Sequence, residues 1–306
     1  MRILITGGAG FIASHIQDAY LADGHEVVVV DNLVTGNRRN LNPKAQFHEL
    51  DVVAIKLHKI FHEFRPDVIN HHAAQIDVRK SVENPVNDAF VNVLGMVNLL
   101  EASRQTSVKK FIFASTGGAI YGEQDYFPAD EKHPLRPASP YGLTKMVGEE
   151  YLKLYERLYR LPSVILRYAN VYGPRQNPHG EAGVVAIFCK KLLQKEIPNI
   201  NGDGKQTRDY VYVGDVVEAN RKALQEGVRG IYNIGTGIET DVNVLFNHLG
   251  SRAGRKEVRH GPAKEGEQRR SVISSRLAEE KIGWKPSVSI KEGLEKTFEW
   301  FRENEK

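Results

Sequence analysis

A glycine-rich turn near the start of the chain constrains the fold more than any other feature of the sequence. Residues 3–6 form a short apolar run, the turn follows from Gly7 to Ala13, and residues 14–22 form an amphipathic segment. This order predicts a strand, a tight turn and a helix. Gly7 allows the turn, Gly10 lets the backbone approach a pyrophosphate, and Ala13 allows close helix–strand packing. The pattern predicts a dinucleotide site at the helix N-terminus.

A second apolar segment, residues 25–30, supports the same unit. Its continuous valines are typical of a strand that is buried on both faces, as in a parallel sheet. Asp31 follows it, 24 residues after Gly7, where a carboxylate accepts hydrogen bonds from an adenosine ribose. Because a carboxylate there repels a 2′-phosphate, we expect NAD and not NADP. Arg38 and Arg39 are the nearby residues that favour NADP.

Strand and helix patterns alternate along the rest of the chain. Further strands are predicted at residues 47–50, 67–70, 110–115, 162–168 and 230–234, and helices at residues 54–64, 84–105, 141–159, 214–225, 245–252 and 290–302. We therefore predict an α/β fold, a Rossmann-type doubly wound parallel sheet with right-handed crossovers.

Prolines and glycines interrupt the alternation after residue 170. This change predicts a smaller α/β C-terminal domain for substrate. The predicted NAD-binding domain covers residues 1–172, with 209–236 returning to it. The predicted nucleotide-sugar-binding domain covers residues 173–208 and 237–306.

Composition argues against several function classes. The 42 basic and 38 acidic residues are well mixed and give a net charge of +4, which is poor evidence for a nucleic-acid partner. Cys189 is the only cysteine, so no internal disulfide can form. No apolar run reaches the roughly 18 to 20 residues that span a bilayer, and the first residues enter a strand directly, leaving no room for a signal peptide. We expect a cytoplasmic protein without membrane contact.

Two adjacent histidines, His71 and His72, invite a metal-site interpretation. On extended chain they face opposite ways, so we expect packing and hydrogen bonding instead. No HExxH motif or cysteine–histidine cluster occurs in the sequence. We predict no metal site.

Tyr141 and Lys145 are candidates for acid–base catalysis. Residues four apart lie on one face of a helix, so both side chains can enter one cleft. A nearby ammonium, together with a cationic nicotinamide ring, would lower the tyrosine pKa from about 10 toward neutral and make the phenol a base. Upstream, Ser115 and Thr116 end a predicted strand, beyond whose carboxyl end open α/β sheets bind ligands. By itself this spacing also fits a surface helix with a packed tyrosine and a solvated lysine.

These motifs together resemble the extended short-chain dehydrogenase/reductase family. The resemblance rests on TGGAGFIA near the start, on Asp31-Asn32, and on Tyr141 with Lys145. LRYANVYGPR from Leu166 and RDYVYVGD from Arg208 are similar to its nucleotide-sugar branch, specifically the UDP-hexose 4-epimerases.

The resemblance implies an isomerase that inverts the sugar C4 hydroxyl through a transient 4-keto sugar with NAD held in place. Tyr141 would take the hydroxyl proton, Lys145 would hold the nicotinamide ribose, and Thr116 would hydrogen-bond the reacting oxygen. It also implies a homodimer formed by the helices near Asn84 and Tyr141.

The expected cofactor-binding residues come from the turn, the strand ends and the catalytic helix: Gly7, Gly10, Phe11, Ile12, Asp31, Asn32, Asp51, Val52, Ala73, Ala74, Asn92, Ser115, Tyr141, Lys145 and Tyr168. The expected substrate-binding residues are Thr116, Tyr141, Asn170, Asn201, Arg208, Lys264 and Glu267. Arg208 would pair with the diphosphate, although a salt bridge to Asp209 is the simpler interpretation.

The chain departs from the family pattern in several places. Counting forward from the strand places the serine or threonine role on Thr116, but counting back from Tyr121 reaches Gly117, because this loop has an extra residue. Lys264 stands where relatives carry an arginine, and Asn201 where many carry an aromatic residue. Ser271, four residues after Glu267, stands where a bulky tyrosine narrows the site of some relatives, and a small residue there would admit N-acetylated sugars.

Other activities remain open. A 4,6-dehydratase or a decarboxylating enzyme would need a carboxylate after Thr116, where Gly117 and Gly118 follow instead. A 4-epimerase of another NDP-sugar, such as UDP-glucuronate, and a non-catalytic NAD-binding protein are the alternatives.

Overall fold

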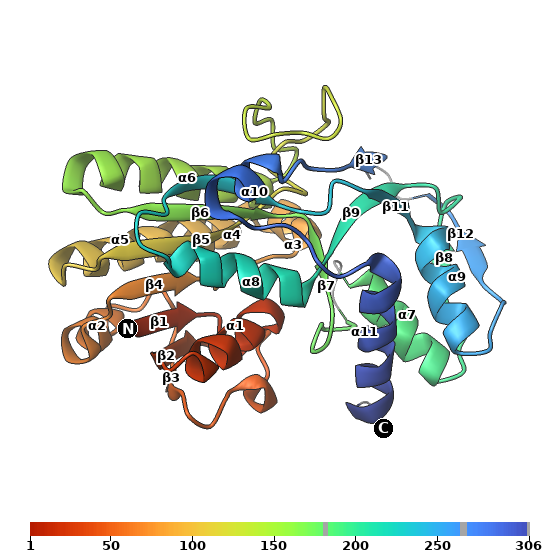
Figure 1. Ribbon diagram of the computed structural model, residues 1–306, viewed down its shortest axis with the longest axis horizontal. Coiled ribbons are helices and arrows are strands. Elements are labelled where there is room, and N and C mark those ends of the chain that lie inside the picture. Colours follow the sequence, from red (N-terminus) through yellow and green to blue (C-terminus); the bar gives the residue numbers. More distant parts are fainter. Residues whose placement is uncertain (180–182, 264–267, 305–306) are drawn as a thin grey trace.

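A seven-stranded parallel sheet forms the centre of the computed structural model, which describes residues 1–179, 183–263 and 268–304 (Figure 1). Its strands are β1 (Arg2–Thr6), β2 (Glu26–Asp31), β3 (Gln46–Glu49), β4 (Val68–His71), β5 (Lys110–Thr116), β6 (Ser163–Tyr168) and β10 (Gly230–Ile234). They lie in the order β10-β6-β5-β4-β1-β2-β3, and every pair is parallel. The predicted fold class is confirmed.

Helices cover both faces of this sheet. One face carries α1 (Phe11–Ala22) and α8 (Val213–Leu224), and the other carries α2 (Leu57–Phe64), α5 (Gly95–Gln105) and α6 (Pro140–Tyr159). Successive side chains of a strand point to opposite faces. In β1, Ile3 and Ile5 accordingly lie in the core under α1 and α8, whereas Leu4 lies in the core under α2, α5 and α6.

The predicted helix at residues 84–105 differs from the observed one. It consists of α4 (Pro85–Ala89), a π-helical turn η2 (Phe90–Leu94) and α5, and a further helix, α3 (Val78–Glu83), precedes it. The Asp77 carboxylate accepts from two N–H groups at the start of α3, and the Asn84 side chain accepts from one N–H group, that of Asn87, at the start of α4. These caps separate α3 from α4.

A smaller region of strands and helices lies at the right of Figure 1. Its four-stranded sheet contains β7 (Asn170–Tyr172), β9 (Thr207–Tyr212), β11 (Glu239–Asp241) and β13 (Arg270–Ser271), and β8 (Asn199–Asn201) pairs with β12 (Arg259–Gly261). The helices α7 (Val184–Leu193), α9 (Val242–Arg252) and α11 (Ile290–Asn304) enclose a third hydrophobic core.

The chain passes between the two regions several times. β7, inside the predicted first domain, pairs with β9 of the smaller sheet. In the opposite sense, α10 (Arg276–Ile282) and Trp284, from the predicted second domain, pack into a core of the large sheet. The domain boundaries at residues 172, 208 and 236 therefore stay a prediction.

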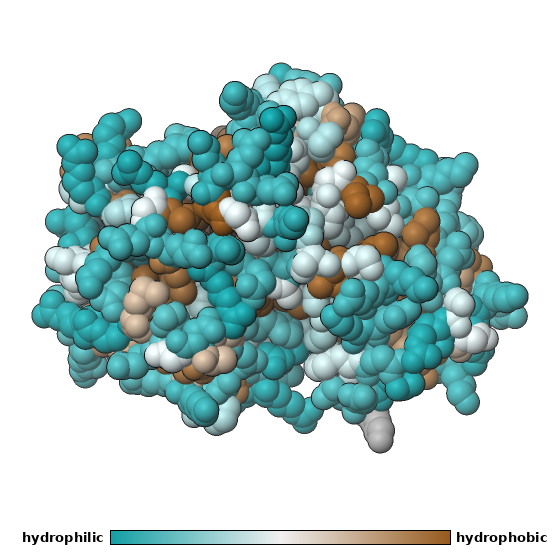
Figure 2. Space-filling view, in the orientation of Figure 1, coloured by the Kyte–Doolittle hydropathy of each residue, from teal (hydrophilic) through white to brown (hydrophobic). Residues whose placement is uncertain are grey.

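The surface is mostly hydrophilic on the face in Figure 2, with brown, hydrophobic atoms in small groups. In the described part of the chain, no helix is both long and apolar enough to cross a membrane.

Candidate active site at the carboxyl edge of the sheet

The glycine-rich turn joins β1 to α1 at the carboxyl edge of the sheet. Gly7 has a φ of +72°, and a Cβ there would lie 2.7 Å from the Ala73 nitrogen. Only glycine meets both conditions easily. Gly10 precedes α1, and no side chain caps the first N–H groups of this helix. Phe11 and Ile12 form its first turn.

Asp31 lies at the end of β2 beside this turn. Its carboxylate accepts hydrogen bonds from the backbone nitrogens of Ala9 (3.0 Å) and Leu33 (2.8 Å), which ties strand and turn together. Burial raises the pKa of Asp31, and the two backbone hydrogen bonds oppose this effect. Next to it, the Asn32 amide donates to the Asp51 carboxylate at 2.8 Å, while Val52 is buried.

These features fit a dinucleotide. The turn permits close backbone approach, the helix N-terminus offers N–H donors, and small Ala73 and Ala74 follow β4 opposite Gly7. The NAD assignment of these residues stays a prediction at the level of single contacts.

Helix α6, which carries the predicted catalytic pair, begins with a strong local signal. Ser139 accepts a hydrogen bond from the Gly142 nitrogen, and Pro140 occupies the first helical position. Tyr141 therefore lies in the first turn of α6, and its hydroxyl is hydrogen-bonded to the Thr116 side chain. The structure thus brings Thr116 to Tyr141, as counting forward from the strand suggested.

The prediction of a near-neutral tyrosine is wrong for the groups that the protein itself supplies. Burial raises the pKa of Tyr141 to about 12, the Thr116 hydrogen bond opposes this, and the Asp88 carboxylate raises it further. The Lys145 ammonium donates to the Ala114 carbonyl oxygen at 2.9 Å and lies over the Phe113 ring.

Lys145 itself is perturbed in the opposite direction. Burial lowers its pKa to about 8, while the carboxylates of Asp88 and Glu149 raise it. A lysine near the neutral range can change its charge under mild conditions. Of the two predicted catalytic partners, the lysine thus has the pKa nearer to neutral.

Ser115 lies one residue before Thr116, but its hydroxyl is committed inside the protein. It donates to the Glu149 carboxylate at 2.6 Å. Glu149 also forms a buried, bidentate ion pair with Arg167, with N–O distances of 2.9 and 2.6 Å. Arg167 donates in turn to the Tyr121 hydroxyl at 2.9 Å. This network joins α6 to the ends of β5 and β6.

The histidines behave as expected from packing. His71 Nδ1 lies 2.7 Å from the Thr6 hydroxyl, and His72 Nε2 lies 3.2 Å from the Tyr168 hydroxyl, which also accepts from Asn220. Burial lowers the pKa of His71 well below its usual value and that of His72 to about 3. Among residues 1–179, 183–263 and 268–304, no group of histidine, cysteine or acidic side chains could hold a metal ion.

On the substrate side, Asn170 begins β7 close to Thr116. A Cβ added to Gly118 would lie 3.5 Å from Asn170 Oδ1 and 3.9 Å from Thr116 Oγ1. Arg208 lies on β9 and donates to the Thr207 carbonyl oxygen. The simpler interpretation, a salt bridge to Asp209, has no support, since the buried Asp209 carboxylate accepts from Thr236 and backbone nitrogens.

The remaining predicted residues are hydrogen-bonded to other parts of the protein or cannot be placed. Asn201 ends β8, where its carbonyl oxygen accepts from Gln206. Lys264 and Glu267 fall outside the described residues. Asn92 is buried, and its side chain bonds to Gln75 and Asp88, so any cofactor contact by Asn92 stays a prediction.

Several residues in the site escaped the sequence interpretation. They are four buried side chains that form two hydrogen-bonded pairs, Thr144 with Asp88 and Arg167 with Glu149. Thr144 and Glu149 lie on the same helix as Tyr141, and Asp88 lies four residues before Asn92. The available signals were the helical spacings of Thr144 from Tyr141 (i,i+3), of Glu149 from Lys145 (i,i+4) and of Asp88 from Asn92 (i,i+4), whereas Arg167 on β6 had no such signal.

Comparison with known proteins agrees with this geometry. The model of the NAD dependent epimerase/dehydratase family matches residues 3–235. A UDP-glucose 4-epimerase of Mycolicibacterium smegmatis is 46% identical, with 99% of each chain covered. The structure of a UDP-glucose 4-epimerase with UDP-glucose from Thermotoga maritima has a TM-score of 0.98 at 48% identity, covering 100% of both chains. A Thermus thermophilus UDP-glucose 4-epimerase in complex with NAD has a TM-score of 0.94 at 47% identity, covering 99% of this chain and 100% of that one. These matches confirm the resemblance to extended short-chain dehydrogenases, and the chain belongs to the NAD dependent epimerase/dehydratase family.

Proposed function

We propose that this protein is an NAD-dependent UDP-glucose 4-epimerase, which interconverts UDP-glucose and UDP-galactose through a transient 4-keto sugar. One observation carries the proposal. Tyr141 is hydrogen-bonded to Thr116 beside buried Lys145 at the carboxyl edge of the sheet, in a chain 48% identical to an epimerase crystallised with UDP-glucose.

The roles of the side chains follow from their positions. Bound NAD supplies a reversible hydride acceptor for the sugar C4. Tyr141 takes the proton of the C4 hydroxyl and later returns it, and Thr116 fixes the phenol oxygen for this transfer. Lys145 contributes positive charge beside them while its amine is protonated. Gly7, Ala73 and Asp31 form the side of the site that receives the dinucleotide.

The sugar nucleotide would lie between the two regions of the molecule. Asn170 is placed for the sugar or the diphosphate because it lies next to Gly118 and Thr116. Arg208 has the guanidinium geometry that suits diphosphate oxygens. We assign Asn201, Lys264 and Glu267 to the rest of the nucleotide on the family resemblance alone.

The substrate range extends to UDP-GlcNAc and UDP-GalNAc in this proposal. Ser271 is buried on β13, directly opposite Arg208 of β9 in the strand register. We infer the wider range from the small size of this side chain. Comparing kcat/KM for UDP-GlcNAc and UDP-glucose tests this, and a preference of about a hundredfold against the N-acetyl sugar contradicts it.

The loop that follows Thr116 argues against a dehydratase. Gly117 and Gly118 follow Thr116, and a Cβ at Gly117 would lie 2.6 Å from the Ile273 side chain. Neither glycine supplies a carboxylate, and a side chain at position 117 would require the Ile273 side chain to move.

The proposal is tested by incubating purified protein with UDP-galactose and no added cofactor. We expect UDP-glucose to appear in the chromatogram, together with the spectrum of a bound nicotinamide and no net NADH. If the nicotinamide is present but UDP-galactose is unchanged, the substrate is another NDP-sugar, such as UDP-glucuronate. Absence of both a nicotinamide and activity contradicts the proposal, and a nicotinamide without activity on any NDP-sugar indicates a binding protein.

We also propose that two copies of the chain associate through α3, α4, η2 and α6. Exposed apolar side chains recur at helical spacing on these elements: Val78, Val82, Val86, Phe90, Leu94 and Leu143. Such a surface favours a second copy over water. Sedimentation of Phe90→Glu should show a monomer where the wild type shows a dimer, and a monomeric wild type contradicts the proposal.

A cytoplasmic location and a place in galactose metabolism complete the proposal. Cys189 is buried and free, and burial raises the pKa of its thiol, so it is unreactive and compatible with a reducing compartment.

A further inference from the structure

One buried carboxylate beside the catalytic pair has no role in the account above. Asp88, on α4, is 0% exposed. Its Oδ2 accepts a hydrogen bond from the Thr144 hydroxyl at 2.8 Å, and its Oδ1 accepts from the side-chain amides of Gln75 at 2.8 Å and Asn92 at 3.2 Å. All three of these donors are neutral. An ionised carboxylate can accept all three hydrogen bonds.

The three partners of Asp88 belong to three parts of the site. Thr144 lies between Tyr141 and Lys145 on α6. Gln75 directly follows the Ala73-Ala74 pair on the side of the dinucleotide. Asn92 lies in the π-helical turn and bonds to both backbone groups of Gln75, at 2.8 and 3.0 Å. Asp88 thus joins the catalytic helix to the cofactor-side loop, and π-helical turns are frequent at functional sites.

The charge of Asp88 acts on both catalytic groups. It raises the pKa of Tyr141 and that of Lys145. Glu149 also raises the pKa of Lys145, but it is paired with Arg167.

The other charged groups around this carboxylate have separate roles. His71 and His72 on β4 have lowered pKa values and stay neutral near pH 7. On α3, Asp77 caps the helix, and the charged side chains are exposed: Arg79, Lys80 and Glu83.

We propose that Asp88 is a positioning residue of the active site, which supplies a counter-charge for Lys145 and holds Thr144, and with it Tyr141, against the cofactor-side loop at Gln75. The inference concerns the chemistry of Tyr141 and Lys145 and so rests on the proposed function.

The test is Asp88→Asn, which keeps the shape and removes the charge. The new amide can donate to Thr144, whose hydroxyl keeps the Tyr141 carbonyl oxygen as its acceptor at 3.0 Å. Phenolate absorbance of Tyr141 is isolated by subtracting the spectrum of the same protein carrying Tyr141→Phe. We expect the midpoint of this titration to fall by about one pH unit in Asp88→Asn. The pH profile of kcat should move in the same direction.

Asp215→Asn is the matched control. Asp215 is also buried and accepts three hydrogen bonds, from the Ser287 hydroxyl and the backbone nitrogens of Ser287 and Val288. This variant should lose stability without moving the Tyr141 titration. The titration needs no substrate, so its outcome is independent of the UDP-galactose assay.

An Asp88→Asn protein that folds with an unshifted titration and an unshifted pH profile overturns the inference. If Asp88→Asn does not fold, Thr144→Val decides the positioning role, because it keeps the Asp88 charge and removes the hydrogen bonds of the Thr144 hydroxyl to Asp88, to the Tyr141 carbonyl oxygen and from Asn92. We expect kcat to fall by about tenfold with KM little changed, and Thr144→Ser to restore it. A wild-type kcat in Thr144→Val overturns the positioning role.

Discussion

Two buried lysines at opposite edges of the large sheet show how similar environments support different roles. Lys145, near the carboxyl edge, and Lys110, at the amino edge, are 4% and 9% exposed, and burial lowers the pKa of both. Each donates to main-chain carbonyl oxygens. The Lys110 acceptors, Ala223 and Gln225, lie at the C-terminal end of α8, so Lys110 satisfies a helix end. Lys145 instead lies among Tyr141, Asp88 and Glu149.

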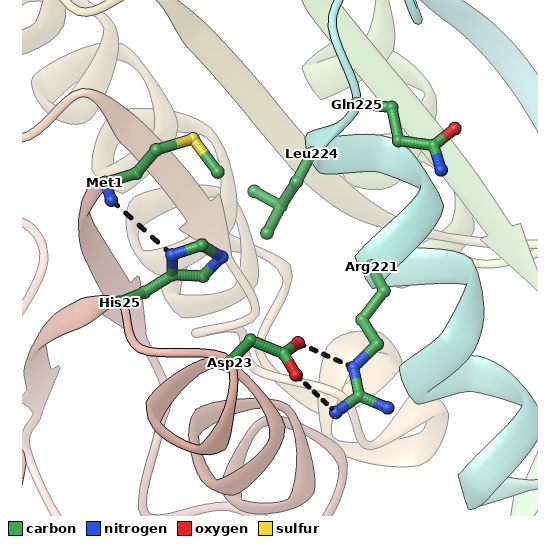
Figure 3. A pocket seen from close by; sticks show the side chains of 6 residues that line it. All are labelled: Met1, Asp23, His25, Arg221, Leu224 and Gln225. Carbon is green, nitrogen blue, oxygen red and sulfur yellow. Dashed lines mark hydrogen bonds and ion pairs between the residues drawn. The ribbon is translucent and has the colours of Figure 1, made fainter.

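The amino edge also contains a cavity of about 450 Å³, lined by Met1, Asp23, His25, Arg221, Leu224 and Gln225 (Figure 3). Its polar groups largely bind one another. Arg221 forms two hydrogen bonds with Asp23, at 2.8 and 3.0 Å, and the Met1 nitrogen lies 3.4 Å from His25. Open α/β sheets bind ligands at the carboxyl edge. A cavity at the other edge is therefore no evidence for a site by itself.

The largest effect is expected for Tyr141→Phe. Loss of the phenol should lower turnover of UDP-galactose by roughly 10² to 10⁴, because no other group takes the hydroxyl proton. Tyr155→Phe is the control on the same helix, since its hydroxyl donates to Glu101 at 2.6 Å, away from the site. Turnover is measured by chromatography, with circular dichroism to confirm folding. Wild-type turnover in Tyr141→Phe removes this residue from the mechanism.

Replacing each lysine by methionine tests the comparison directly. Lys145→Met should lower turnover by roughly 10²-fold, because it removes a cation beside the reacting oxygen. Lys110→Met should keep its turnover but lose about 1 to 3 kcal/mol of unfolding free energy, since the buried Ala223 carbonyl oxygen loses its ammonium donor and the Gln225 carbonyl oxygen keeps only the Val228 nitrogen. Equal turnover in the two variants would contradict the assignment of chemistry to the carboxyl edge.

Two glycines with similar backbone angles allow a second comparison. Gly7 has a φ of +72° and Gly24, before β2 at the amino edge, has a φ of +79°. A Cβ on Gly24 meets nothing within 4 Å, whereas one on Gly7 is blocked by Ala73. Gly24→Ala should cost about 1 kcal/mol of stability from backbone conformation alone.

Gly7→Ala should cost more than Gly24→Ala and should also weaken NAD retention, which is measured by the nicotinamide content of the purified protein. Equal NAD content in the two variants would argue against the turn as the pyrophosphate site.

The sequence predicts the fold and part of the candidate site, but not the contacts that depend on the folded structure. The strand and helix alternation, the turn and the Tyr141–Lys145 spacing follow from local patterns, and each predicted strand of the large sheet occurs within a residue of its expected ends. The Tyr141 pKa could not be predicted, because it depends on burial and on the direction of the Lys145 ammonium. Asp88 was missed for a related reason, since its partners Gln75 and Thr144 are 13 and 56 residues away.

Lys145 and Lys110 should both add to stability as the pH rises, because burial lowers the pKa of each lysine in the folded protein. The unfolding free energy of the wild type minus that of Lys145→Met should rise from about pH 8 to about pH 10.5, and stay flat below this range. In that range the unfolded lysine keeps a proton that the folded one has lost, so unfolding binds protons. Urea titrations across this range measure the difference. A falling difference would mean that Lys145 gains a partner for its charge.

The smallest effect is expected for Arg221→Ala in the amino-edge cavity. Arg221 is about one-third exposed and pairs with Asp23 and Glu218, so solvent screens both interactions. We expect a loss of about 0.2 to 1 kcal/mol in unfolding free energy, with unchanged turnover and NAD content. Asp23→Ala should give a similar loss, and the double variant little more than either, because both remove the same pair. Denaturant unfolding and the UDP-galactose assay measure these quantities. A large fall in turnover in Arg221→Ala would show that the two edges are coupled, and the chemistry could then no longer be assigned to the carboxyl edge alone.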